Sequence, residues 1–93
     1  MVEIDEATVI KLSPMASFQS LGEDAVVLMV DSGQLYSCNG TTEAFLKAVD
    51  GVRSLAEIID LVSPEFDVDR ETLRSDFRVL AAELCSEGIV TTV

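Results

Sequence analysis

The chain lacks histidine and tryptophan, and it has only two cysteines among its 93 residues. Cys38 and Cys85 lie far apart and form no C-x-x-C pair, so the sequence contains no ligand set for a zinc site. Neither thiol has an obvious general base, and there is no G-x-S-x-G nucleophile motif. We therefore predict a protein that is not an enzyme and that holds no metal or other cofactor.

Basic residues are also scarce, because 6 Lys and Arg stand against 17 Asp and Glu, which gives a net charge of −11. Nucleic acids and anionic membranes are bound through clustered Lys and Arg, so this composition argues against both partners. No apolar run reaches the roughly 18 residues that span a membrane. The first six residues are acidic where a signal peptide would be basic. We expect a cytoplasmic protein.

Apolar runs separated by turn residues fill the first half of the chain. They predict strands over 16–21, 25–30 and 34–38, joined by turns at 22–24 and at Asp31-Ser32-Gly33. Short turns between successive strands indicate an antiparallel meander. Residues 1–15 are ambiguous, although 8–12 are strand-like. We assign 1–15 to a flexible N-terminal segment and 16–93 to a single domain.

The second half of the chain has helical patterns bounded by capping residues. They predict three helices, from Thr41 or Thr42 to Gly51, from the capping box at Ser54 to Pro64, and from the N-cap Asp69 to Gly88. Residues 89–93 are β-prone and predict a short strand or an extended tail. Strands followed by helices indicate an α+β fold, with a three-stranded antiparallel sheet followed by three helices.

The third predicted strand, 34–38, lies between a tight turn and a helix, which is typical of an edge strand. An edge strand exposes unpaired N–H and C=O groups, to which a peptide can add as a further strand. Strand alternation places Leu35 and Ser37 on one face and Tyr36 and Cys38 on the other. The sequence leaves open which of the two faces belongs to the core.

The order of these features resembles the PqqD-like family of small peptide-recognition domains in ribosomal peptide modification pathways. The resemblance lies in the stretches VVLMVDSGQLYSCNGTTEAFLKAVDGVRSLAEII and FDVDRETLRSDFRVLAAELCSEGIV. It includes the D-S-G turn, the strand that ends at Asn39, and the helix that ends at Asp50-Gly51. The match covers about residues 16–91, and Cys38 stands where the family usually has Leu.

The resemblance implies a winged-helix-like fold that binds the leader segment of a precursor peptide. The leader would add to the third strand, the third helix would form the opposite wall, and a partner enzyme would modify or cleave the attached precursor. We therefore predict peptide-binding residues on the strand, namely Gln34, Leu35, Tyr36, Ser37 and Cys38, and on the helix, namely Arg70, Leu73, Arg74, Phe77, Arg78 and Ala81.

Arg70, Arg74 and Arg78 share one helix face and make up half of all basic residues. The stripe is either a solvated face that pairs with neighbouring acids or an electropositive wall that attracts acidic leader residues.

Two other function classes are compatible with the fold. One is a winged-helix DNA-binding or transcriptional module, which the net charge argues against. The other is a structural or regulatory subunit of an enzyme, without a peptide ligand.

Overall fold

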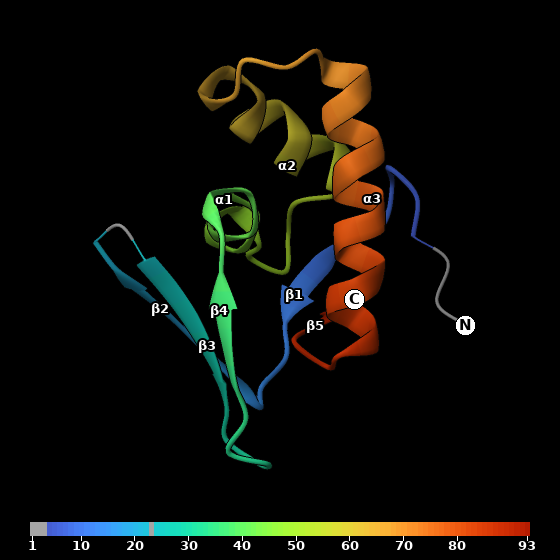
Figure 1. Cartoon of the computed structure of the whole chain (residues 1–93). Coiled ribbons are helices and arrows are strands. Elements are labelled where there is room, and N and C mark those ends of the chain that lie inside the picture. The colour runs from blue at the N-terminus through green and yellow to red at the C-terminus, as the bar shows by residue number, and fades with distance from the viewer. Residues whose placement is uncertain (1–3, 23) are drawn as a thin grey trace.

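Three strands form an antiparallel sheet in the order β2-β3-β4 (Figure 1). They are β2 (Ala16–Leu21), β3 (Asp24–Met29) and β4 (Leu35–Cys38). The computed structural model describes residues 4–22 and 24–93. The predicted meander is confirmed with boundaries that agree within one residue. Residue 23 of the predicted turn, and residues 1–3 of the predicted N-terminal segment, lie outside the described residues.

The helices are α1 (Gly40–Ala48), α2 (Leu55–Val62) and α3 (Arg70–Ser86), and the short 3-10 helix η1 (Ser63–Glu65) follows α2. The predicted capping box is present, since Ser54 and Glu57 each accept a hydrogen bond from the other's backbone N–H. Asp69 caps α3 as predicted. The cap of α1 differs from the prediction. Asn39 has extended backbone and its Oδ1 accepts from the N–H of Thr42 (2.9 Å), so the helix begins at Gly40, before both predicted starts. It also ends at Ala48, before the predicted stop at Gly51.

A second sheet of two strands joins the ends of the chain. Strand β1 (Ile10–Leu12) pairs antiparallel with β5 (Val90–Thr92), which confirms the predicted C-terminal strand. The predicted domain boundary at residue 16 does not match this arrangement. The side chain of Ile10 is fully buried and Ile4 is 5% exposed, so the described residues before 16 pack into the same core.

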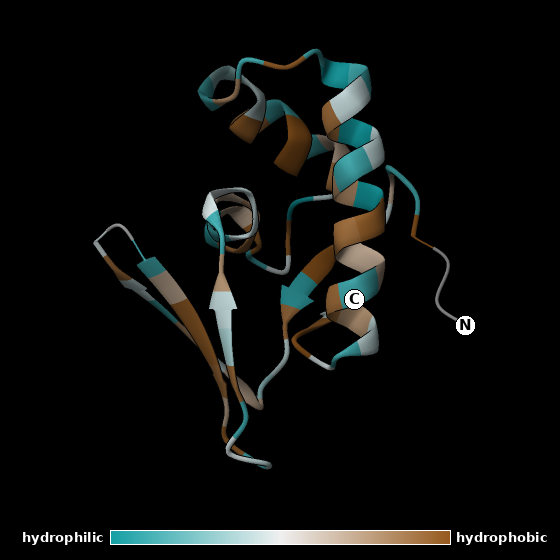
Figure 2. Ribbon diagram, viewed as in Figure 1, coloured by the Kyte–Doolittle hydropathy of each residue, from teal (hydrophilic) through white to brown (hydrophobic). Residues whose placement is uncertain are grey.

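The core lies where the helices meet the inner face of β3 and the β1-β5 pair. Figure 2 shows hydrophobic residues on the parts of β3, α2 and α3 that contribute to it. Phe45 of α1 and Phe77 of α3 are fully buried and meet edge to face, with ring centroids 5.3 Å apart. Within residues 4–22 and 24–93, no helix has both the length and the apolar character needed to cross a membrane.

Candidate functional site

One edge of β4 has no partner strand in the described part of the chain. Met29 donates its backbone N–H to the carbonyl oxygen of Gln34 (2.8 Å), which fixes the phase of the ladder between β3 and β4. Bonded pairs alternate along an antiparallel ladder, so the even-numbered residues of β4 bond to β3. Leu35 and Ser37 therefore point their backbone N–H and C=O groups toward the open edge.

A groove of about 410 Å³ lies between β4 and the C-terminal half of α3. Its lining is mixed, because it combines an apolar floor with polar groups on both walls. The strand contributes Tyr36, Ser37 and Cys38, α3 and the residue after it contribute Leu80, Glu83, Leu84, Ser86 and Glu87, and Val27, Thr42 and Ile89 complete the surface. The groove is therefore adjacent to the strand that has free backbone groups.

Local interactions at both ends of β4 fix its position. The preceding turn closes when Gly33, at φ +76°, donates its N–H to the carbonyl oxygen of Met29 (2.7 Å). This left-handed conformation favours glycine. At the other end, Asn39 caps α1, so the strand continues directly into the first turn of the helix. The turn at Gly33 and the cap at Asn39 together fix the position of the open edge of β4.

A hydrogen bond connects the two walls of the groove. The hydroxyl oxygen of Tyr36 lies 3.0 Å from Oε2 of Glu87 and 3.0 Å from Oε1 of Gln34. The hydroxyl group has one proton, which it can donate to either of these two oxygens. The hydrogen bond to Glu87 raises the pKa of Tyr36 above its ordinary value, because ionising the phenol would remove the donated proton. Tyr36 therefore remains neutral and links β4 to the end of α3.

The strand residues predicted from the sequence lie together at this site. Tyr36 and Cys38 are half-buried, whereas Leu35 is 65% exposed. The face of β4 with Tyr36 and Cys38 therefore belongs to the core side, and the face with Leu35 and Ser37 is the outer face. Ser37 is exposed and lines the groove. Burial raises the pKa of the Cys38 thiol, so little thiolate is present at neutral pH.

The helix residues predicted from the sequence lie elsewhere on α3. Leu73, Phe77 and Ala81 are buried in the core, where they support the groove without lining it. The sequence analysis did not identify as site residues those that α3 and the residue after it contribute to the groove, which are Leu80, Glu83, Leu84, Ser86 and Glu87. A sequence signal for them exists, because Leu80 with Leu84 and Glu83 with Glu87 are i, i+4 pairs on neighbouring strips of the same helix.

The arginine stripe is on the flank of α3 that faces the N-terminal segment. Arg70 donates to Asp60 (2.9 Å) and lies 3.7 Å from Glu6, while Arg74 pairs with Glu6 (3.9 Å) and with Glu71. Arg74 and Arg78 line a hollow with residues 5–7 and do not line the groove beside β4. Exposed pairs of this kind contribute at most about 1 kcal/mol each. That the stripe attracts an acidic leader residue stays a prediction.

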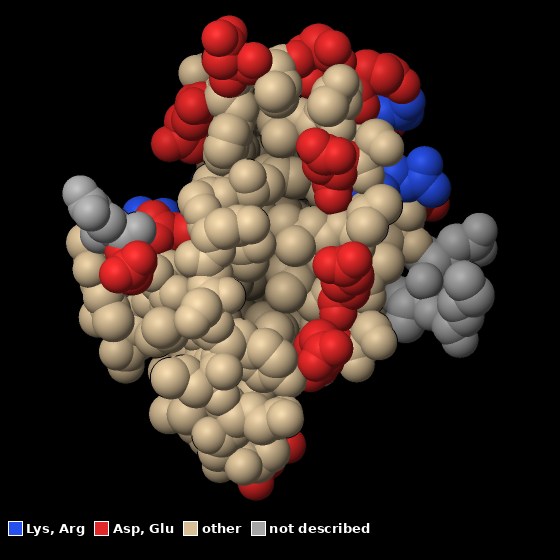
Figure 3. Space-filling model, viewed as in Figure 1, with Lys and Arg blue, Asp and Glu red and all other residues tan. Residues whose placement is uncertain are grey.

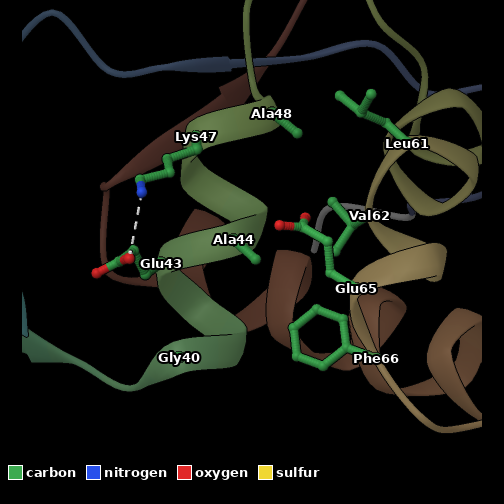
Figure 4. Close-up of a pocket in the computed structure, with 9 residues that line it drawn as sticks. All are labelled: Gly40, Glu43, Ala44, Lys47, Ala48, Leu61, Val62, Glu65 and Phe66. Atoms are coloured by element: carbon green, nitrogen blue, oxygen red, sulfur yellow. Dashed lines mark ion pairs between the residues drawn. The ribbon is translucent and has the colours of Figure 1, made fainter. Parts of the chain in front are cut away.

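A separate hollow of about 290 Å³ lies between α1 and α2 (Figure 4). Ala44 of α1 points toward Val62 of α2, and the ring of Phe66 closes one end. The charged residues Glu43 and Lys47 form an ion pair (3.3 Å), and no strand edge borders this hollow. Among residues 4–22 and 24–93, no three His, Cys, Asp or Glu side chains are grouped to hold a metal ion.

Comparisons with known proteins agree with this geometry. The family Coenzyme PQQ synthesis protein D (PqqD) matches residues 24–90. A structure of TbiB1 in complex with the TbiA(beta) leader peptide has a TM-score of 0.78 at 20% identity, over 86% of this chain and 93% of that chain. A lasso peptide synthetase B1 complexed with the leader peptide has a TM-score of 0.78 at 22% identity, over 89% and 98%. The sequence matches none of the curated proteins with which it was compared.

The two structures share the fold of this chain, and the family match runs through most of the sequence. The matched residues include β3, β4, all three helices and the start of β5, and so they contain the groove and both of its walls. The resemblance drawn from the D-S-G turn and the helix boundaries is confirmed. The chain belongs to the PqqD family.

Proposed function

We propose that this chain binds the leader segment of a ribosomally made precursor peptide by adding it as a strand to β4. The observation that carries the proposal is the open edge at which Leu35 and Ser37 present their backbone groups beside the groove. Each of these two residues offers one donor and one acceptor to an incoming strand. Such main-chain bonds provide affinity for many sequences, and the groove side chains provide selectivity.

The relatives support this ligand. Both similar structures are complexes with leader peptides, and they share the fold that places a strand edge beside α3. The alternative of DNA binding lacks comparable support, because the charged residues in the groove are Glu83 and Glu87, which repel phosphate.

We propose further that the chain is non-catalytic and presents the bound precursor to a peptide-modifying or leader-cleaving enzyme. Its groove has one thiol, that of Cys38, and two carboxylates but no histidine, and the thiol has a raised pKa. A thiol that remains protonated at neutral pH is a poor nucleophile. The reacting groups would therefore come from the partner enzyme.

Thiol labelling during a titration tests the site of binding. The titration uses a synthetic peptide with the sequence of a candidate leader, and peptide mapping by mass spectrometry follows alkylation of each cysteine. Cys38 lines the groove and Cys85 does not, yet both thiols are free, half-buried and raised in pKa by burial. Mildly alkaline buffer is needed, because a raised pKa reduces the thiolate fraction at neutral pH.

We expect saturating leader to slow alkylation of Cys38 about tenfold, since only the unbound fraction exposes the groove, and to leave Cys85 unchanged. Equal protection of both thiols would indicate a general tightening of the protein. Saturated binding with no protection of Cys38 would show that the leader binds elsewhere.

A further inference from the structure

The groove is acidic on its helical wall. Glu83 and Glu87 are its charged lining residues, and no Lys or Arg lines it. Glu87 already accepts a hydrogen bond from Tyr36, whereas Glu83 is exposed and makes no ion pair within the described residues. The carboxylate of Glu83 is therefore available to a ligand in the groove.

One strip of α3 carries acidic residues and no basic ones. Asp76, Glu83 and Glu87 fall at i, i+7 and i+11, which places them along one strip, while the arginines occupy another flank. Figure 3 shows acidic side chains following the length of α3, with basic side chains gathered at the side of its N-terminal half. Neighbouring like charges repel one another, so a cation bound along the acidic strip relieves that repulsion.

The groove also has an apolar strip beside the free carboxylate. Leu80 is half-buried and Leu84 is 8% exposed, and both line the groove on the same helix as Glu83. A lysine or arginine side chain has an apolar stem and a charged end, so it can place its methylene groups on apolar surface while the charge reaches a carboxylate. An acidic ligand residue at this position would meet only like charge.

We infer that the leader recognised by this chain carries a lysine or arginine that passes α3 at Glu83, with its stem on Leu80 and Leu84. The inference rests on the proposed function, because it assumes a strand added to β4. In such a strand every second side chain points to the same face, so one residue in two is directed toward α3. We therefore expect the basic residue at one of the leader positions that face α3, which alternate along the strand with positions that face outward.

Peptide display provides a probe that requires no knowledge of the natural precursor. Random peptides of about 15 residues, long enough to pass the strand and both flanks at about 3.3 Å per residue, are selected on the immobilised full chain. The selected peptides are synthesised, and their affinities are measured for the wild type and for variants. Glu83→Lys is the test variant, and Asp67→Lys is the control. Both substitutions change the net charge by the same amount, but Asp67 lies in an exposed segment outside the groove.

We expect wild-type protein to enrich peptides with Lys or Arg. Glu83→Gln should weaken their binding about two- to fivefold, as for an exposed ion pair, and Glu83→Lys about tenfold or more, because it replaces attraction with repulsion. Asp67→Lys should change binding less than about twofold, since a distant charge is screened. The loss from Glu83→Lys should also shrink as salt rises.

The possible outcomes separate this inference from the proposed function. Selected peptides that protect Cys38 from alkylation but show no excess of basic residues, or that tolerate Glu83→Lys, would overturn the inference alone. Selected peptides that bind without protecting Cys38 would overturn strand addition at β4. Equal losses from Glu83→Lys and Asp67→Lys would show that only the net charge of the protein matters, and would likewise overturn the inference.

Discussion

Ser37→Pro should weaken leader binding by about tenfold or more while the protein remains folded. The substitution removes a backbone N–H that points to the open edge, and each lost hydrogen bond costs about 0.5–1.5 kcal/mol. The proline ring also occupies the edge to which the leader strand must add. The ladder to β3 is unaffected, because the N–H of Ser37 points away from β3. Proline is tolerated at such an edge position.

Ser20→Pro is the matched control for this variant. The N–H of Val30 donates to the carbonyl oxygen of Met15 (2.8 Å), and the register of β2 with β3 then places the N–H of Ser20 on the outer edge of β2. Both variants exchange an exposed serine for proline at an outward-pointing donor, but on opposite edges of one sheet. Fluorescence anisotropy of a labelled leader measures both affinities. Wild-type affinity in a folded Ser37→Pro variant would exclude strand addition at β4.

Ile10→Ala should lower the free energy of unfolding by about 2–5 kcal/mol, as for a large-to-small change in a core. The side chain of Ile10 is fully buried, and its strand is the partner of β5. Lys11→Ala, at the exposed neighbour in the same strand, should cost about 0.5 kcal/mol or less.

Urea titrations followed by circular dichroism measure the stability of both variants. We expect Ile10→Ala to lower the urea concentration at the midpoint of unfolding and to leave the dependence of the unfolding free energy on urea concentration unchanged. Similar midpoints for the two variants would mean that the segment before residue 16 contributes little to the core.

The elements that the sequence predicted well are those with a local cause. The capping box at Ser54, the cap at Asp69 and the turn at Asp31-Ser32-Gly33 between two strands all depend on residues that are close together in the chain. Strand β1 has no such cause, because it is only 3 residues long and its partner, β5, lies at the other end of the sequence. Its burial becomes apparent only when the chain ends are brought together.

The same reasoning explains what the sequence predicted of the site. The edge strand was identified from its place between a turn and a helix, and the structure adds which of its residues point outward. The resemblance predicted binding residues on the third helix such as Phe77, which prove to be core, because it does not state which flank of that helix lies beside β4. The groove uses the adjacent flank, where Leu80 is half-buried and Glu83 is exposed.

Nuclear magnetic resonance can test directly whether a leader adds to β4, since the chain has a mass of only 10.0 kDa. Scalar couplings through hydrogen bonds identify which N–H donates to which carbonyl group. With isotope-labelled leader bound, we predict couplings from the N–H groups of Leu35 and Ser37 to leader carbonyl groups. Tyr36 and Cys38 should couple only to β3. Saturated binding with no coupling between the leader and Leu35 or Ser37 would contradict strand addition.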